Sequence, residues 1–207
     1  MPPKSKKIKN QKQERIANFL FELGTMRKLM RIHRQTLLTD DLSDSITSHS
    51  YRVAMIAWFL AKEEGAEPYK TVMMGLLHDV GEIRSNDHNW IHKKYVKIFN
   101  DEISEEQLGT LPFPDLKNLI DEYEERKTKE SILVKEADTL DQILLLREYE
   151  WAGNKEAEVW LRGKGGKKEA TQLAKLKTDI GRKLGLAIYK VNPSDWWNSL
   201  WTSKNRK

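Results

Sequence analysis

Apolar residues recur at helical spacing along nearly the whole chain, whereas the alternation typical of strands is scarce. A first helix is expected over residues 14–33, where Ile16, Phe19, Leu20 and Leu23 share one face. Further helices are expected near residues 46–64, 68–81, 90–99, 121–125, 129–151 and 170–189. The pattern therefore predicts an all-α protein.

Glycine and proline mark several boundaries between these helices. Gly65 follows the apolar stripe of the second helix, and Pro68 suits the first turn of the third. Gly81 is expected to interrupt the third helix, so we interpret the polar residues 82–90 as a loop. Residues 162–168, with three glycines and four basic residues, are expected to form a flexible loop, and the glycine spacing matches no phosphate-binding loop.

The organisation along the chain predicts one domain with two short appendages. Residues 1–13 are expected to be a basic disordered tail, because they contain five lysines and no acid before residue 13. Residues 14–190 are expected to form the helical domain, with the helix at 129–151 buried in its centre because it has apolar side chains on more than one face. Residues 191–207 form an aromatic-rich C-terminal segment with a basic end.

Composition narrows the chemistry and the partners. The formal net charge of +5 equals the five lysines of the N-terminal tail, so a nucleic-acid partner is not expected apart from that tail. The chain has no cysteine, so any metal must be bound by His, Asp or Glu. The longest apolar run, residues 53–61, is too short to cross a bilayer, and we expect a soluble cytoplasmic protein with no membrane partner.

Four polar residues interrupt apolar faces that are expected to meet in the core. His49 shares a face with the apolar stripe of its helix, His78 and Asp79 end the third helix, and Asp138 lies on the central helix. A structural hydrogen bond or a helix cap explains any one of them alone. Burying all four is costly unless a divalent cation binds them, so together they favour a metal site.

The order of these residues, a His, then a His-Asp doublet, then an Asp, resembles the HD-domain metal-dependent phosphohydrolases. The similarity covers about residues 14–150 and includes the segments 48–54, 76–82 and 135–142, in a pattern similar to the 5′-deoxynucleotidase branch. The resemblance implies an HD-domain helical bundle around a single metal site. It also implies that one divalent transition metal, which can be Mn, Co, Fe, Ni or Zn, is bound by His49, His78, Asp79 and Asp138.

The same resemblance assigns three further residues. Glu82 and Asp87 match the acidic pair that acts on the attacking water, and Arg31 matches an arginine that contacts the substrate phosphate. Spacing agrees for Glu82, which follows His78 by one helical turn. Arg31 would share a helix face with neighbouring arginines, which also fits a solvated basic stripe. His33 follows where that branch has an aromatic residue, so the nucleoside preference stays open.

The expected reaction is hydrolysis of (deoxy)nucleoside 5′-monophosphates to nucleoside and phosphate, by a protein that the family implies is a homodimer. One alternative is a phosphodiesterase or a nucleotide-pyrophosphate hydrolase on the same fold, with Lys93, Lys94 and the 162–168 loop binding further phosphates. Another is a non-catalytic nucleotide-binding module with a structural metal. Glu82 and Asp87 argue against this last alternative, because a structural site does not need both.

Overall fold

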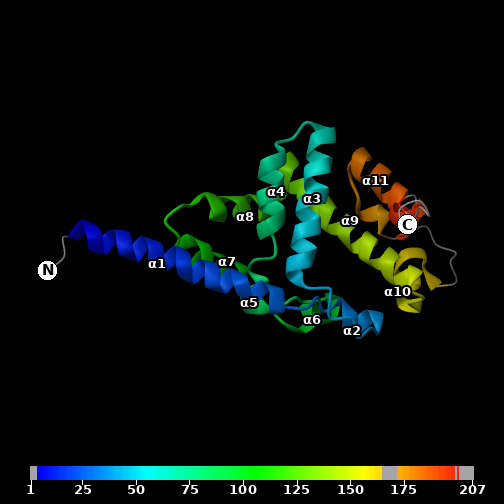
Figure 1. Ribbon diagram of the computed structural model, residues 1–207, viewed down its shortest axis with the longest axis horizontal. Helices are drawn as coiled ribbons and strands as arrows, with labels where there is room; N and C mark the ends of the chain where they lie inside the picture. The colour runs from blue at the N-terminus through cyan, green and yellow to red at the C-terminus, as the bar shows by residue number, and fades with distance from the viewer. Residues whose placement is uncertain (1–3, 165–171, 199, 201–207) are drawn as a thin grey trace, which may run out of the picture.

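The computed structural model describes residues 4–164, 172–198 and 200, and their regular secondary structure is helical apart from one isolated bridge between Met30 and Ser45 (Figure 1). The prediction of an all-α protein is confirmed. The helices are α1 (Lys4–Thr25), α2 (His33–Leu37), α3 (Ile46–Glu64), α4 (Pro68–Leu77), α5 (Glu82–Ser85), α6 (Trp90–Tyr95), α7 (Asn100–Ser104), α8 (Asp115–Glu125), α9 (Lys129–Trp151), α10 (Lys155–Arg162), α11 (Asp179–Lys190) and α12 (Asp195–Asn198), with the short turns η1 (Met26–Lys28), η2 (Glu105–Gly109) and η4 (Leu173–Lys175).

Helix α9 is the centre of the fold, as its apolar pattern predicts. It packs against α3, α4, α8, α10 and α11. Leu133, Ala137 and Leu140 of α9 are fully buried in one core with Val53 of α3 and Met74 of α4. Burial of such side chains is worth about 1.5–3 kcal/mol each, so the helices that carry the polar candidates are held together by this core.

Helix α3 has well-defined ends, and it packs closely on α4. The hydroxyl of Ser45 accepts a hydrogen bond from the backbone N–H of Ser48 at the start of α3, and Gly65 ends the helix with a φ of +66°. Pro68 begins α4 as expected. A Cβ on Gly75 would lie only 2.9 Å from Cα of Ala54, so this glycine allows the two helices to approach each other.

The first helix differs from the prediction at both ends. Helix α1 begins at Lys4 instead of Glu14, so most of the segment predicted as a disordered tail is helical, consistent with the high helix propensity of Lys and Gln. It ends at Thr25 instead of His33. Beyond η1 the backbone pairs with the segment before α3, because the N–H of Arg31 donates to the carbonyl of Asp44 at 2.8 Å. Residues 1–3 lie outside the described chain.

The C-terminal helix also begins later than residue 170. Helix α11 starts at Asp179, because the hydroxyl of Thr178 caps it and the carboxylate of Glu136 accepts the N–H of Thr178 at 2.7 Å. Leu176, just before this cap, is fully buried, so this part of the chain belongs to the core. Residues 165–171 of the predicted loop and helix, and residues 199 and 201–207 of the aromatic segment, lie outside the described residues.

Smaller differences concern the polar segments. The predicted loop 82–90 contains α5, the helix expected up to Phe99 ends at Tyr95 in α6, and the acidic helix α8 begins already at Asp115. The amphipathic helix α10 was not expected. No helix within the described residues is both long and apolar enough to cross a membrane.

Candidate metal centre

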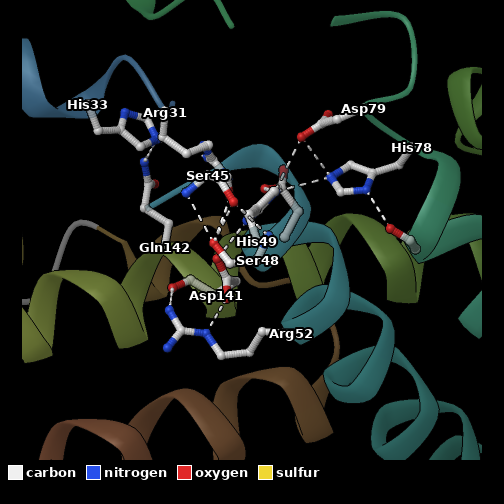
Figure 2. A network of polar contacts seen from close by, with 12 residues as sticks. Arg31, His33, Ser45, Ser48, His49, Arg52, His78, Asp79, Asp141 and Gln142 are labelled. Atoms are coloured by element: carbon white, nitrogen blue, oxygen red, sulfur yellow. Dashed lines mark hydrogen bonds and ion pairs between the residues drawn. The ribbon is translucent and has the colours of Figure 1, made fainter. Parts of the chain in front are cut away.

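Three elements bring the four candidate ligands together, of which Figure 2 shows His49, His78 and Asp79. His49 comes from the first turns of α3, His78 and Asp79 follow the end of α4, and Asp138 comes from α9. Nε2 of His49 lies 3.2 Å from Nε2 of His78, 3.3 Å from Oδ2 of Asp79 and 3.4 Å from Oδ1 of Asp138. His49, His78 and Asp79 thus form a compact group whose possible ligand atoms all lie within 4.8 Å of one another, and Asp138 lies beside His49.

Hydrogen bonds on the far side of each imidazole orient the cluster. Nδ1 of His78 donates to the carbonyl of Gly75 at 2.8 Å, and Nδ1 of His49 lies 2.6 Å from Oδ2 of Asp141. With both Nδ1 atoms engaged as donors, the two Nε2 atoms face each other and the carboxylate of Asp79. Nitrogen and oxygen atoms this close repel unless a proton or a metal ion lies among them. The donor set therefore fits a divalent metal ion, for which mixed His and Asp ligands are typical.

The charges in the cluster favour a positive charge among its carboxylates. Burial and Arg31 lower the pKa of His49, but its hydrogen bonds with Asp141 and Asp79 outweigh them and raise this pKa to about 9, so the metal-free ring carries a proton on Nε2 that a metal ion would displace. Burial raises the pKa of Asp79, but the neighbouring His78 and His49 hold it well below its usual value. The pKa of Asp138 is lowered as well, against burial, by Lys135 and the two histidines. The carboxylates therefore stay ionised, as ligands of a cation must be.

The cluster lies on the wall of a large cavity. The cavity has a volume of about 1050 Å³, and its lining includes His78, Asp79 and Asp138. The histidine side chains are almost fully buried, whereas those of Asp79 and Asp138 are about one-fifth exposed. A ligand in the cavity can thus reach the carboxylate side of the cluster.

Glu82 lines the same cavity from the first position of α5. Its Oε2 is buried, and it has no hydrogen-bond partner among residues 4–164, 172–198 and 200. Burial, followed by the charges of Asp79 and Asp87, raises the pKa of Glu82 to about 9. Glu82 thus shares the cavity wall with Asp79 and Asp138, and its role stays a prediction.

Asp87 and Arg31 form a pair at another part of the cavity wall. Oδ2 of Asp87 accepts the backbone N–H of Ile32 at 2.8 Å and lies 3.5 Å from Nε of Arg31. Arg31 is buried in an extended segment, whereas Arg27 and Arg34 are exposed. The expectation that these three arginines share one helix face is wrong, because α1 ends before them and the chain there pairs with the segment preceding α3.

Sequence reasoning gave no role to several residues that shape the site. His33 lies 3.0 Å from Nη2 of Arg31, and burial and Arg31 lower the pKa of His33 to about 4, so its neutral ring can accept from the guanidinium. Asp141 orients His49 and also accepts from Nε of Arg52. Its spacing of three residues from Asp138 on one helix was the available signal. Nothing in the local pattern indicated His33, because its position depends on how the chain folds back after α1.

An all-helical fold that places His49, His78 and Asp79 together beside a cavity fits the class of helical metal-binding proteins. The sequence comparison is more specific. The family model described as "HD domain" matches residues 26–178, and the chain belongs to this family. The resemblance drawn from the motif is confirmed.

Individual relatives add detail. The chain is 35% identical to "5′-deoxynucleotidase HDDC2" of Dictyostelium discoideum over 123 residues. This match covers 53% of this chain and 65% of that protein. The chain thus matches slightly less than two thirds of that relative's length. Its fold is similar to a conserved hypothetical protein from Pyrococcus furiosus, with a TM-score of 0.68, 26% identity, and coverage of 84% of this chain and 99% of that one. A "Predicted metal-dependent phosphohydrolase" from Magnetospirillum magnetotacticum has a TM-score of 0.65 at 24% identity, covering 92% of this chain and 95% of that one, and shows the likeness of fold alone.

Proposed function

We propose that this protein is a metal-dependent phosphohydrolase that converts (deoxy)nucleoside 5′-monophosphates to nucleoside and phosphate. The observation that carries the proposal is that His78, Asp79 and Asp138 lie on the wall of a cavity that Glu82 also lines, with His49 directly behind them. Similarity to a 5′-deoxynucleotidase supports the substrate class.

The four converging side chains would hold one divalent cation. When bound, such an ion supplies Lewis-acid chemistry toward a phosphoryl oxygen and toward water. Mn, Co, Fe, Ni and Zn all accept a mixed set of imidazole and carboxylate ligands.

Glu82 is the group proposed to move the proton. Water attacks phosphorus, the bond between phosphorus and the 5′ oxygen breaks, and the proton passes from the water through Glu82 to the leaving 5′ oxygen. Burial beside other carboxylates raises the pKa of Glu82 to about 9, and a nearby positive charge lowers it again toward neutrality, where a group both accepts and donates a proton efficiently. Asp87 also lines the cavity, and we retain it as a candidate for orienting the water.

Arg31 is proposed to bind the phosphoryl oxygens. A guanidinium offers two parallel donors to a phosphate, and the contacts with Asp87 and His33 hold this one in place before substrate arrives. Since Arg31 is buried, its charge is poorly screened by solvent and acts strongly on charge that develops nearby.

A second candidate is hydrolysis of a larger nucleotide, through a phosphodiester or a pyrophosphate. The observation that favours it is the cavity volume of about 1050 Å³, with Lys93 in its lining. No such observation favours a module with a purely structural metal, because that alternative does not explain why the carboxylate of Glu82 is buried in the cavity wall.

A phosphate-release screen separates these functions. The purified protein is assayed with nucleoside monophosphates, cyclic nucleotides and nucleotide pyrophosphates, each with several divalent metals, and the Glu82→Gln variant serves as the control for contaminating phosphatase. We expect turnover of monophosphates by the wild type and almost none by the variant. A diesterase or a pyrophosphate hydrolase leaves phosphate on the nucleotide or releases pyrophosphate, so the nucleotide products are also separated by chromatography. Conversion of cyclic nucleotides or nucleotide pyrophosphates alone would select the second candidate, and equal phosphate release from monophosphates by both proteins would refute the proposal.

The homodimer and the cytoplasmic location implied by the sequence stay predictions. Analytical ultracentrifugation tests the first, and subcellular fractionation tests the second.

A further inference from the structure

Arg126 has an unusual backbone conformation at the edge of the cavity. It follows the last residue of α8 with a φ of +54°, in the left-handed region that glycine and asparagine fill most readily. A long side chain at such a position lowers stability relative to glycine. A contact of the Arg126 side chain is therefore expected to explain why arginine occupies this position.

The guanidinium of Arg126 lies close to the metal candidates. Its Cζ is 3.2 Å from the ring centroid of Tyr123, and the buried Tyr123 ring packs edge-on against His78, with 5.5 Å between centroids. Arg126 lines the same cavity as Asp79 and Asp138. One aromatic ring therefore separates this cation from a candidate metal ligand.

The hydrogen-bonding capacity of Arg126 is incompletely used. Several other guanidinium groups, such as those of Arg52, Arg84 and Arg147, donate to carboxylates. By contrast, Nη1 of Arg126 is buried and has no hydrogen-bond partner within the part of the chain that the structure describes. A buried donor without an acceptor is costly, and an anion entering the cavity would satisfy it.

Arg126 and Arg31 approach the metal candidates from different directions. Figure 2 shows Arg31 and His78 on different sides of His49. Arg126 is connected to the His78 side through the stack with Tyr123. Two guanidinium groups thus line the same cavity, and only Arg31 of the two is matched to the phosphate contact by the family motif.

We propose that Arg126 binds a phosphoryl oxygen of the substrate from the His78 side of the cavity, opposite the contact made by Arg31. The proposal rests on the proposed function, since it takes the ligand to be a phosphate ester. Tyr123 positions the guanidinium by stacking beneath it, and the anion supplies the acceptor that Nη1 lacks.

Inorganic phosphate is the probe, because it is the smallest ligand with the required oxygens. Its affinity for the metal-loaded full chain is measured by isothermal titration calorimetry in the wild type, Arg126→Gln and Arg126→Gly. The control is Lys127→Gln, which removes the same charge from the next residue, whose exposed side chain pairs with Glu125 and does not itself line the cavity. We expect both Arg126 variants to bind phosphate about 10–100-fold more weakly, the range for loss of a charge-assisted hydrogen bond, and the control to match the wild type.

Metal content and thermal midpoint distinguish binding from a structural role. Arg126→Gly relieves the left-handed backbone, so we expect it to keep the metal and a midpoint close to that of the wild type while it loses phosphate affinity. Wild-type affinity in Arg126→Gln would overturn the proposal. Loss of phosphate binding together with loss of metal would overturn it too, because Arg126 would then act by holding Tyr123 against His78.

The outcome also separates this inference from the proposed function. A wild type that binds phosphate through Arg126 but releases none from any nucleotide would refute the proposed function alone. A protein that hydrolyses nucleoside monophosphates while Arg126→Gln binds phosphate normally would refute this inference alone.

Discussion

Oδ2 of Asp141 lies 2.6 Å from Nδ1 of His49, and this contact determines which nitrogen of the imidazole faces the candidate metal site. Burial raises the pKa of Asp141, but its hydrogen bond with His49 and the charges of His49 and Arg52 lower it below its usual value, so the carboxylate stays ionised. An ionised carboxylate behind a histidine fixes the ring and makes its other nitrogen a better ligand.

Asp141→Asn is therefore expected to weaken metal binding without removing a ligand. Loss of such an orienting carboxylate typically reduces metal affinity about 10–100-fold. Competition with a chromogenic chelator measures the change. Glu148→Gln is the matched control, because Glu148 accepts from the same Arg52 at 2.6 Å but is not a partner of His49. Equal affinities in the two variants would show that Asp141 does not act through His49.

Glu82→Gln is expected to keep the metal and the fold and to lose about 10²–10⁴-fold in turnover, the range for removal of a general acid-base group. The amide has nearly the same shape but cannot accept or release the proton. Steady-state kinetics on the best monophosphate, together with elemental analysis, provide the test. Turnover near that of the wild type would show that Glu82 is not the proton-transferring group. The variant Asp87→Asn would then test Asp87 for this role in the same assay.

The same substitution is expected to stabilise the metal-free protein at alkaline pH. The pKa of Glu82 is raised from 4.5 to about 9, so the folded state binds this proton more tightly than the unfolded state does. Its contribution to stability is complete below the unfolded pKa and is lost as pH rises toward the folded pKa. The thermal midpoint of Glu82→Gln in chelator should thus exceed that of the wild type at about pH 8.5 and approach it at about pH 5. A pH-independent offset for Glu82→Gln would contradict the assignment.

Arg31→Ala is expected to impair handling of the phosphate, whereas Arg27→Ala and Arg34→Ala leave it almost unchanged, since those two side chains are exposed. Arg31→Lys should be impaired as well, because an ammonium cannot form the planar two-point contact. Kinetics of the four variants on one monophosphate show whether the loss appears in KM, in turnover or in both. A collapse in Arg34→Ala with a normal Arg31→Ala would place the phosphate elsewhere.

Much of the fold follows from periodicity, because most helices bury a regular apolar stripe. The central position of α9 was predicted for this reason, and the core around Leu133 and Leu140 confirms it. The break after Thr25 was not predictable in this way. Apolar residues continue at helical spacing through Met30, and only the pairing of Arg31 with Asp44 in the folded chain ends the helix.

The residues of the candidate site also fall into those that a sequence motif predicts and those that only the folded chain reveals. The motif indicated His49, His78, Asp79 and Asp138, and the structure brings them together. Their roles as ligands stay predictions. The sequence alone did not indicate Arg126. Its proposed role depends on a left-handed backbone and on a stack on Tyr123, and both depend on how α8 packs in the folded chain.

The rate of phosphate release as a function of metal per chain tests the central claim most directly. Chelator-treated protein is titrated with the best metal from the screen, and initial rates are measured on one deoxynucleoside 5′-monophosphate, with His78→Ala in parallel. We expect the rate to rise from near zero and level off at about one equivalent, as one four-ligand site requires, and to stay near zero in His78→Ala. Full activity in the metal-free protein, or an equal response in His78→Ala, would contradict a metal centre built from these four residues.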